Sequence, residues 1–509
     1  MEARSVLRSP ESRPPLAVVP LAAVALAIIG VHVLCLTQYG WFRDELYYAS
    51  CARRLAWGYV DHPPFSVAVL ALVRAVFGSG LVAPRLVAAL VSALVSVTAG
   101  AIARELGGRR YAQVLAALAL GLAPLSLAVG HFFSLNVFDL LFWSLATLLA
   151  LRAFETDALA TWGAVGVTLG LGLLNKWSVL WLGSGLAVAL LVSPQRRRLL
   201  GVGPWLAAAL AAAVFAPNLI WEKLHAWPTL EFMHNARTQK MAALDPLKYL
   251  LNLVLAMGPG CAPIWLAGLF VAFARARWRP LAIVFVVTLV ILFASGSARV
   301  EYLALATPAL FAAGATWWEM RGRFARGAIA SAAVVLAIPI APLALPVLPI
   351  PTFLSWQAVL GRQPHSEERH RMGQLSQQYA DMFGWPELAD SVARVAAMLT
   401  ADERARAIVV VDNYGEAGAL EQFGAGRLPR IACQHNNWFL WGPPAWDGTV
   451  AILLRRDSTD ARREFDDVRV AAIAGHPLAM PYERDLPILI ARGFHADLAA
   501  AWKQGKHYQ

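Results

Sequence analysis

The stretch YAQVLAALALGLAPLSLAVGHFFSLNVFDLLFWSLATLLAL, residues 111–151, contains no acidic or basic side chain other than Asp139 and His131. An apolar run of about 20 residues is long enough to cross the hydrocarbon core of a bilayer as a helix. This stretch is about twice that length, so it predicts two spans, at residues 111–130 and 131–151. Similar segments without charge fill most of the first 360 residues, at 16–36, 86–103, 158–175, 177–195, 199–221, 249–274, 280–298, 302–318 and 327–361. Together they predict about eleven transmembrane helices.

The composition supports the same class of protein. Of 509 residues, 58% are hydrophobic and only 15% are charged, whereas a soluble domain is about a quarter charged. The net charge of +11 comes from short arginine clusters between apolar blocks, which is the pattern of loops that anchor spans at a membrane surface. We therefore expect membrane lipids as partners and no nucleic acid. The four cysteines are scattered and have neither metal-site nor disulfide spacing.

The arginine clusters predict the orientation. With eleven spans, all five clusters lie on one side of the membrane, namely 4, 8 and 13; 104, 109 and 110; 196–198; 275, 277 and 279; and 321, 323 and 326. The positive-inside rule makes that side cytoplasmic. The N-terminus is then cytoplasmic and everything after residue 360 lies outside the plasma membrane.

Two extramembrane regions stand out. The first outer loop, residues 37–81, is long, aromatic and charged, and its residues 65–73 suit a helix lying in the interface. Residues 361–509 contain more charge and three strand-like runs, at 407–411, 449–454 and 488–491. The sequence therefore predicts a transmembrane domain over residues 1–360 and a small soluble α/β domain over residues 361–509. Residues 327–361 are expected to begin as a span and to end as a proline-stiffened exit.

Four side chains near the predicted outer surface are candidates for chemistry. Asp44 follows the first span, where apolar surroundings make a carboxylate a better proton acceptor. Asp139 lies within a span, where a carboxylate is costly and is a functional candidate by default. Lys176 and Arg299 lie at the same level and could hold a phosphate. The structural alternatives are an interfacial pair of Asp44 with Arg43, a buried hydrogen-bonded acid, and cations that extend to lipid headgroups.

Several other chemistries are disfavoured by the motifs. The sequence has no phosphate-binding glycine loop, no dinucleotide-binding fingerprint and no nucleophile elbow. His62, His131, Asp44, Asp61 and Asp139 could ligate a divalent metal, but their spacing matches no metal motif. We therefore expect no cofactor and no metal.

Two motifs of the first outer loop, FRDELYY (residues 42–48) and LAWGYVDHPPF (residues 55–65), resemble bacterial glycosyltransferase family 39 of the GT-C superfamily. That superfamily includes protein O-mannosyltransferases and lipid A aminoarabinose transferases. The resemblance continues through DLL (139–141), LLNKW (173–177), PNLIW (217–221), GP (258–259), NYGEAG (413–418), HNNW (435–438) and WGP (441–443).

The resemblance implies a sugar transferase of a bacterial inner membrane. Its donor would be a polyprenyl-phosphate sugar, and its acceptor a hydroxyl of an extracytoplasmic glycan, lipid or protein of the cell envelope. Asp44 corresponds to the catalytic base, Glu45 is its neighbour in the motif, and Asp139 corresponds to a second catalytic acid. Asp61 and His62 correspond to an acid and a cation near the donor phosphate, although some relatives have lysine where His62 stands. Lys176 matches a lysine of many members.

The outer domain is expected to shape the choice of acceptor, with Glu416, His435 and Trp438 in the contacting segments. Two other functions are compatible with the sequence. One is a transporter or flippase of lipid-linked sugars that uses Asp139 and Lys176 as polar groups within the membrane. The other is a non-catalytic membrane subunit that presents the outer domain.

Overall fold

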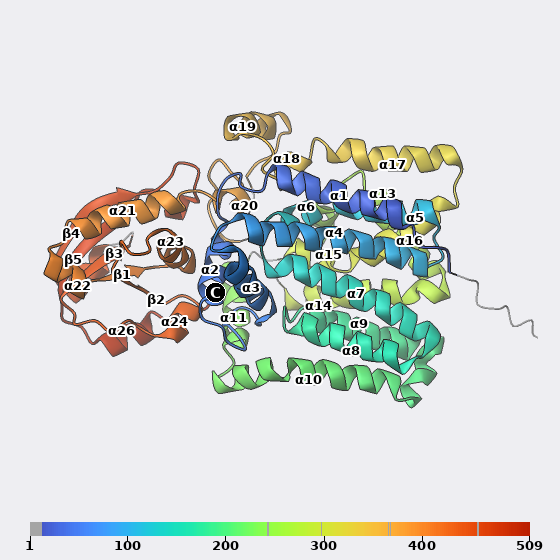
Figure 1. Ribbon diagram of the computed structural model, residues 1–509, viewed down its shortest axis with the longest axis horizontal. Coiled ribbons are helices and arrows are strands. Elements are labelled where there is room, and N and C mark those ends of the chain that lie inside the picture. Colours follow the sequence, from blue (N-terminus) through green and yellow to red (C-terminus); the bar gives the residue numbers. More distant parts are fainter. Residues whose placement is uncertain (1–12, 242–243, 297, 365, 367, 456–457) are drawn as a thin grey trace, which may run out of the picture.

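Long helices lie side by side in one bundle, and a sheet domain covers one end of it (Figure 1). This computed structural model describes residues 13–509 except 242–243, 297, 365, 367 and 456–457. Each predicted span contains at least one helix. These helices are α1 (Val18–Leu34), α4 (Val82–Glu105), α5 (Arg110–Leu122) with α6 (Pro124–His131), α7 (Leu135–Thr156), α8 (Leu159–Leu173), α9 (Val179–Val192), α10 (Gly203–Leu224), α12 (Pro246–Ala256) with α13 (Ala262–Ala274), α14 (Arg279–Ser295), α15 (Val300–Ala304) with α16 (Thr307–Glu319), and α17 (Arg323–Ala337).

The chain is a polytopic α-helical membrane protein. By length and composition, α4, α7 and α10 could each cross a membrane alone, and the number rises to six if three bent helix pairs each form one span. The bend of 64° between α5 and α6 has a simple cause. Pro124 opens α6 and keeps Ala123 extended at ψ 129°, because the residue before a proline is disfavoured in the helical region. The count of eleven spans remains a prediction.

Small residues allow the helices to approach closely. A side chain on Gly314 of α16 would collide with the backbone of Ile264 in α13, and one on Gly268 would collide with Leu310. In a bilayer, helix association depends on such close packing because the lipid tails are as apolar as the side chains. The contacts of α13 with α16 therefore need glycine on both sides.

The regions outside the bundle follow the predictions in part. The first outer loop forms α2 (Arg43–Ala52) and α3 (Phe65–Phe77), and α3 is the helix expected from residue 65. After α17, the proline-rich exit forms two short helices, α18 (Ala341–Ala344) and α19 (Ile350–Val359). The remaining short elements of the loops are η1 (Pro194–Leu200), α11 (Pro228–Asn235), the π-helical η2 (Ala236–Lys240) and η3 (Ala276–Trp278).

The C-terminal domain, residues 361–509, which we call the outer domain after its predicted side of the membrane, contains a five-stranded mixed sheet with the order β2-β1-β3-β5-β4. Its strands are β1 (Ile408–Val411), β2 (Arg430–Cys433), β3 (Val450–Leu454), β4 (Phe465–Ala474) and β5 (Leu486–Phe494). β1 pairs in parallel with β2 and β3, and β5 pairs antiparallel with β3 and β4. The three predicted strands are confirmed as β1, β3 and β5, whereas β2 and β4 were not predicted. The helices are α20 (Gln377–Ala380), α21 (Trp385–Ala397), α22 (Ala401–Arg406), α23 (Tyr414–Phe423), α24 (Asn437–Trp441), α25 (Ser458–Glu464) and α26 (Leu498–Gln504), with the 3₁₀ turn η4 (Pro481–Glu483).

The two ends of the bundle differ in charge. At the end away from the sheet, arginines from separate clusters share carboxylates, as Arg13 and Arg277 both pair with Glu155. The predicted outer loops gather at the other end, beneath the sheet (Figure 1). The structure therefore separates the arginine clusters from the candidate residues, as the predicted topology requires. Which end faces the cytoplasm remains a prediction.

We predict that Ala425→Cys is labelled from outside intact cells and that Arg197→Cys is not. Both positions are exposed in the structure, and all four native cysteines are buried, so the background should be low. A membrane-impermeant maleimide measures the difference, and permeabilised cells provide the control for reactivity. Labelling of Arg197→Cys in intact cells would contradict the predicted orientation.

Candidate functional site

A cavity of about 360 Å³ lies between the end of the bundle and the outer domain. Its lining side chains fall into three chemical groups. They are acidic and aromatic residues, cations, and apolar residues of α6, the turn after it and the start of α7. The main members are Asp44, Tyr48, Asp61 and Tyr414; Lys176, Lys240 and Arg299; and Leu125, Ala128, Val129, Phe132 and Leu135.

The position of α2 is fixed by Glu45, which is buried. Both carboxylate oxygens of Glu45 pair with the Arg85 guanidinium of α4, at 3.0 Å from Nε and 2.8 Å from Nη2. The same carboxylate accepts the backbone N–H of Phe42 and that of Phe133. Arg85 also donates to the carbonyls of Leu36 and Gly40. Glu45 therefore joins α2 to α4 and to the segment before α7. These contacts suit a residue that holds α2, and with it Asp44, in position.

Asp44 is the neighbour that faces the cavity. Its side chain is 31% exposed, and its Oδ1 accepts a hydrogen bond of 3.0 Å from the Tyr414 hydroxyl of α23. The guanidinium of Arg43 lies 3.8 Å from the same oxygen and stacks on the Tyr414 ring. The structure thus combines the two expectations for Asp44, because it is ion-paired at the interface and still accessible from the cavity.

The outer domain packs directly on α2. A side chain at Gly415 would lie 2.6 Å from Arg43 Cγ, and one at Gly418 would lie 2.8 Å from the backbone of Leu46. Both contacts are tighter than ordinary side-chain contacts allow. Glycine at these two positions of α23 therefore lets the helix approach α2 closely enough for Tyr414 to reach Asp44.

Lys176 enters the cavity between α8 and α9. Its Nζ donates to Asn136 Oδ1 at 2.8 Å, lies 3.8 Å from Asp139 Oδ2 and stacks over the Tyr302 ring. Asp139 is fully buried behind it, and its two carboxylate oxygens share one hydrogen bond from the Ser178 hydroxyl, which lies 2.7 Å from each of them. Asp139 therefore supports Lys176 from behind the cavity wall.

Arg299 belongs to a second cationic group. It pairs with Glu301 and with the buried Glu368. Lys240 lies 3.5 Å from the same carboxylate of Glu368. Burial lowers the pKa of Lys240 although Glu368 opposes that effect. The pKa of Glu368 is held well below its usual range because His370 and both cations outweigh its burial. Lys240 and Arg299 are thus matched by the carboxylates of Glu301 and Glu368, which hold both cations in place at the cavity.

Asp61 and His62 separate in the structure. Asp61 faces the cavity and accepts a hydrogen bond of 2.8 Å from Tyr47, and burial raises the pKa of its carboxyl. His62 is fully buried beneath it, with Nδ1 2.9 Å from the Pro63 carbonyl and Nε2 3.9 Å from Asp61. Contact of His62 with a donor phosphate is therefore indirect in this geometry.

The three residues expected to contact an acceptor are buried in the outer domain. Glu416 accepts the backbone N–H of Asp412 and caps the start of α23, and burial raises the pKa of its carboxyl. His435 stacks on Tyr414, and Trp438 stacks on the guanidinium of Arg54. These contacts place the three residues behind the cavity lining, and their role with an acceptor remains a prediction.

Sequence reasoning missed several lining residues. They include Tyr48, Lys240, Glu301, Tyr302, Glu368, Asp381 and Tyr414. Asp381 lies against Arg43, and burial raises the pKa of its carboxyl to about 6. The signals for this group in the sequence were the FRDELYY motif, which ends at Tyr48, and the NYGEAG motif, which begins one residue before Tyr414. Within the described chain, no group of three His, Cys, Asp or Glu side chains is arranged to hold a metal ion.

A family model described as dolichyl-phosphate-mannose-protein mannosyltransferase matches residues 61–221, about a third of the chain. The structure is similar to that of ArnT from Cupriavidus metallidurans bound to undecaprenyl phosphate, with a TM-score of 0.62 and 18% sequence identity over 93% of this chain and 97% of that one. The apo structure of the same protein gives a TM-score of 0.59 at 18% identity over the same shares.

The chain has a GT-C fold. A second protein with this fold, the arabinofuranosyltransferase AftD from Mycobacteria, matches with a TM-score of 0.54 and 15% identity over 93% of this chain and 40% of its own. No curated protein sequence matches this chain. The GT-C fold confirms the expectation from the first-loop motifs.

We predict that Glu45→Gln destabilises this GT-C fold, because it removes the charge that compensates the buried Arg85. Breaking a buried ion pair from one side typically costs about 3–5 kcal/mol. Thermal unfolding of the purified protein, followed by size-exclusion chromatography, measures the effect. Asp390→Asn breaks an exposed ion pair with Arg427 and should change the melting temperature little. Equal melting temperatures for Glu45→Gln and the unaltered protein would contradict the prediction.

Proposed function

We propose that this chain is an integral-membrane glycosyltransferase that moves a sugar from a polyprenyl-phosphate donor to a hydroxyl on the outer side of the membrane. The observation that carries the proposal is the three-part lining of the cavity. A polyprenyl-phosphate sugar has an apolar tail, an anionic phosphate and a polar sugar. The apolar, cationic and acidic parts of the lining match these three groups in kind.

The cations are suited to the leaving group. Lys176 and Arg299 line the cavity, and guanidinium and ammonium groups bind phosphate oxygens by charge-assisted hydrogen bonds. Negative charge grows on the phosphate as its bond to the sugar breaks, so cations fixed nearby stabilise the transition state more than the ground state. We assign Lys176 and Arg299 to this role, with Asp139 as the residue that positions Lys176.

Asp44 is suited to be the general base. Its carboxylate is accessible from the cavity and is held by Tyr414 and Arg43. In the proposed reaction, the acceptor hydroxyl gives its proton to Asp44 while its oxygen forms a bond to the anomeric carbon. The bond from that carbon to the phosphate oxygen breaks, and its electron pair leaves with the polyprenyl phosphate. A single displacement of this kind inverts the anomeric configuration.

Asp61 lies on the same wall as Asp44, where a carboxylate would repel a phosphate. Its place favours hydrogen bonds to hydroxyls of the donor sugar, with His62 beneath it as support. The similarity to ArnT bound to undecaprenyl phosphate supports this function over the transporter alternative. The resemblance also favours an acceptor in the bacterial cell envelope.

We predict that Asp44→Asn lowers the turnover number by about 10²–10⁴-fold, because the amide keeps the shape of the side chain but takes up no proton. Transfer by the purified protein in nanodiscs measures this, with expression and melting temperature as checks of folding. Asp390→Asn, an exposed acid of the outer domain, is the matched control and should keep full activity. Near-normal transfer by Asp44→Asn would refute the assignment of the base.

We predict that the protein uses a polyprenyl-phosphate sugar and not the matching nucleotide sugar, and that transfer survives EDTA. Lys176→Gln should lower kcat/KM for the donor because it removes a cation that stabilises the departing phosphate, whereas Lys503→Gln in α26 should not. Assays with each donor in nanodiscs test this directly. Transfer from the nucleotide sugar alone would overturn the proposed donor. Loss of transfer on chelation would show that the reaction requires a metal ion.

A further inference from the structure

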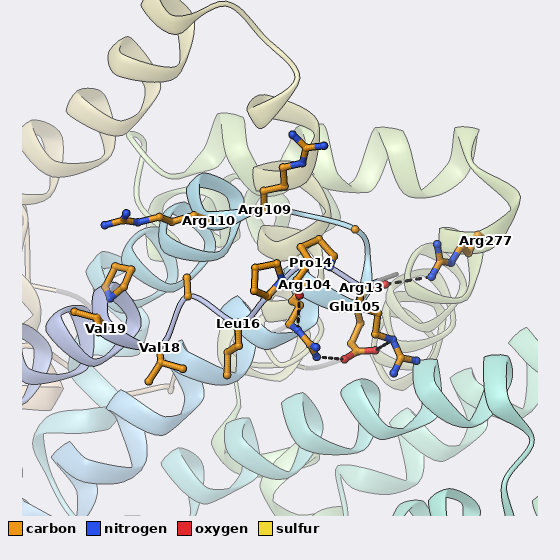
Figure 2. Close-up of a pocket in the computed structure, with 14 residues that line it drawn as sticks. Arg13, Pro14, Leu16, Val18, Val19, Arg104, Glu105, Arg109, Arg110 and Arg277 are labelled. Atoms are coloured by element: carbon orange, nitrogen blue, oxygen red, sulfur yellow. Dashed lines mark hydrogen bonds and ion pairs between the residues drawn. The ribbon is translucent and has the colours of Figure 1, made fainter. Parts of the chain in front are cut away.

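A second cavity lies at the opposite end of the bundle, where the start of α1 meets the end of α4 and the start of α5 (Figure 2). Its volume is about 1170 Å³, somewhat above the ~300–1,000 Å³ of typical small-molecule pockets. Two kinds of side chain line it. They are the arginines Arg13, Arg104, Arg109, Arg110 and Arg277, and the apolar residues Leu16, Val18, Val19 and Pro20.

The arginines at the floor of this cavity are ion-paired. Glu105 is buried and pairs with Arg13 at 2.8 Å and with Arg104 at 3.3 Å. Arg152, outside the cavity, lies 2.8 Å from the same carboxylate. Arg277 pairs with Glu155 and also donates to the Glu105 carbonyl. These contacts hold the ends of several helices together, and because four arginines face two carboxylates, the floor keeps a net positive charge.

The rim is different, because Arg109 and Arg110 are both exposed. Figure 2 shows their side chains extending away from the paired group around Glu105. Within the part of the chain that the structure describes, neither guanidinium has an acidic partner. The backbone N–H of Arg109 donates to Glu319 at 2.7 Å, which fixes the turn but compensates neither side chain.

These two arginines are also at an unfavourable end of a helix. Arg109 is the N-cap of α5 and Arg110 is its first residue, so two cations lie at the positive end of the helix dipole. The Glu319 carboxylate already accepts the backbone N–H groups of Arg109 and Ala112 at this helix end, so a bound anion would interact with the guanidinium groups rather than with the backbone. The rim therefore has the charge and the geometry of an anion site.

The other wall requires an apolar ligand group. Val18 is 62% exposed and Val19 is 80% exposed at the start of α1, a helix of a membrane protein whose apolar side chains face lipid. A free anion would leave this wall uncovered. A ligand that joins an anionic head to acyl chains matches both walls at once.

We propose that this cavity binds the headgroup of an anionic phospholipid in the leaflet that contacts the arginine clusters. The phosphate would lie at the rim that carries Arg109 and Arg110, and an acyl chain would cover Val18 and Val19. The site is separate from the sugar-transfer cavity, so the proposal is independent of the proposed function.

Native mass spectrometry of the full-length protein in detergent tests the proposal with three probes, phosphatidylglycerol, phosphatidylcholine and inorganic phosphate. We expect the protein to retain phosphatidylglycerol in preference to phosphatidylcholine, and excess phosphate not to displace it. The double variant R109Q/R110Q should lose about tenfold or more in affinity, as the loss of charge-assisted contacts implies. R196Q/R197Q removes the same charge from exposed arginines of η1 at the same end and should change affinity by less than about twofold.

Three results would overturn the proposal. Equal losses in the two double variants would mean a diffuse electrostatic attraction without a site. Displacement by phosphate would mean an anion site that does not need the lipid chain. Equal retention of both lipids by the unaltered protein would mean no headgroup preference. If R109Q/R110Q does not fold, R110Q is compared with R196Q in the same way.

Discussion

The buried ion pair between Glu45 and Arg85 is the contact on which the geometry of the site depends. It joins the first outer loop to the core of the bundle, and its remaining hydrogen bonds fix the backbone at Phe42 and Phe133. A charge pair of this kind is costly to bury and is kept only where its partners are well arranged. The pair leaves the adjacent Asp44 at the start of α2, turned toward the cavity. The two adjacent carboxylates thus differ in environment, because that of Glu45 is buried and ion-paired and that of Asp44 is accessible from the cavity.

The spans and the outer loop could be predicted because each depends on a local property of the chain. Hydropathy over about 20 residues located the helices, and the first-loop motifs located Asp44 and Asp61. The strands β1, β3 and β5 were found because they are buried and apolar. β4 was missed because it is an edge strand in which Asp466, Asp467 and Arg469 interrupt the apolar pattern. β2 was missed because only four residues form it and the first is Arg430.

The cations that line the cavity, Lys176, Lys240 and Arg299, could be predicted only in part, because they come from segments that are distant in the sequence. Lys176 and Arg299 stood out as isolated charges beside apolar spans. Lys240 and Glu368 did not, since each lies in a polar loop where a charge is ordinary. Only folding brings the two loops together, and neither loop contains a hydrophobic periodicity or a motif that indicates the contact between Lys240 and Glu368. The same reason explains Tyr414, which lies 370 positions from Asp44 in the chain.

The close packing of α23 on α2 has a consequence for protein engineering. The sequence suggests a cut near residue 360, where the transmembrane part ends and the outer domain begins. The structure joins these parts through Gly415 and Gly418, which leave no room for a methyl group against Arg43 and Leu46. A chimaera that exchanges only residues 361–509 would pack a foreign helix against α2, whose surface is complementary to α23 of this protein. The exchangeable module therefore has two pieces, and a graft of the outer domain should carry residues 43–52 with it.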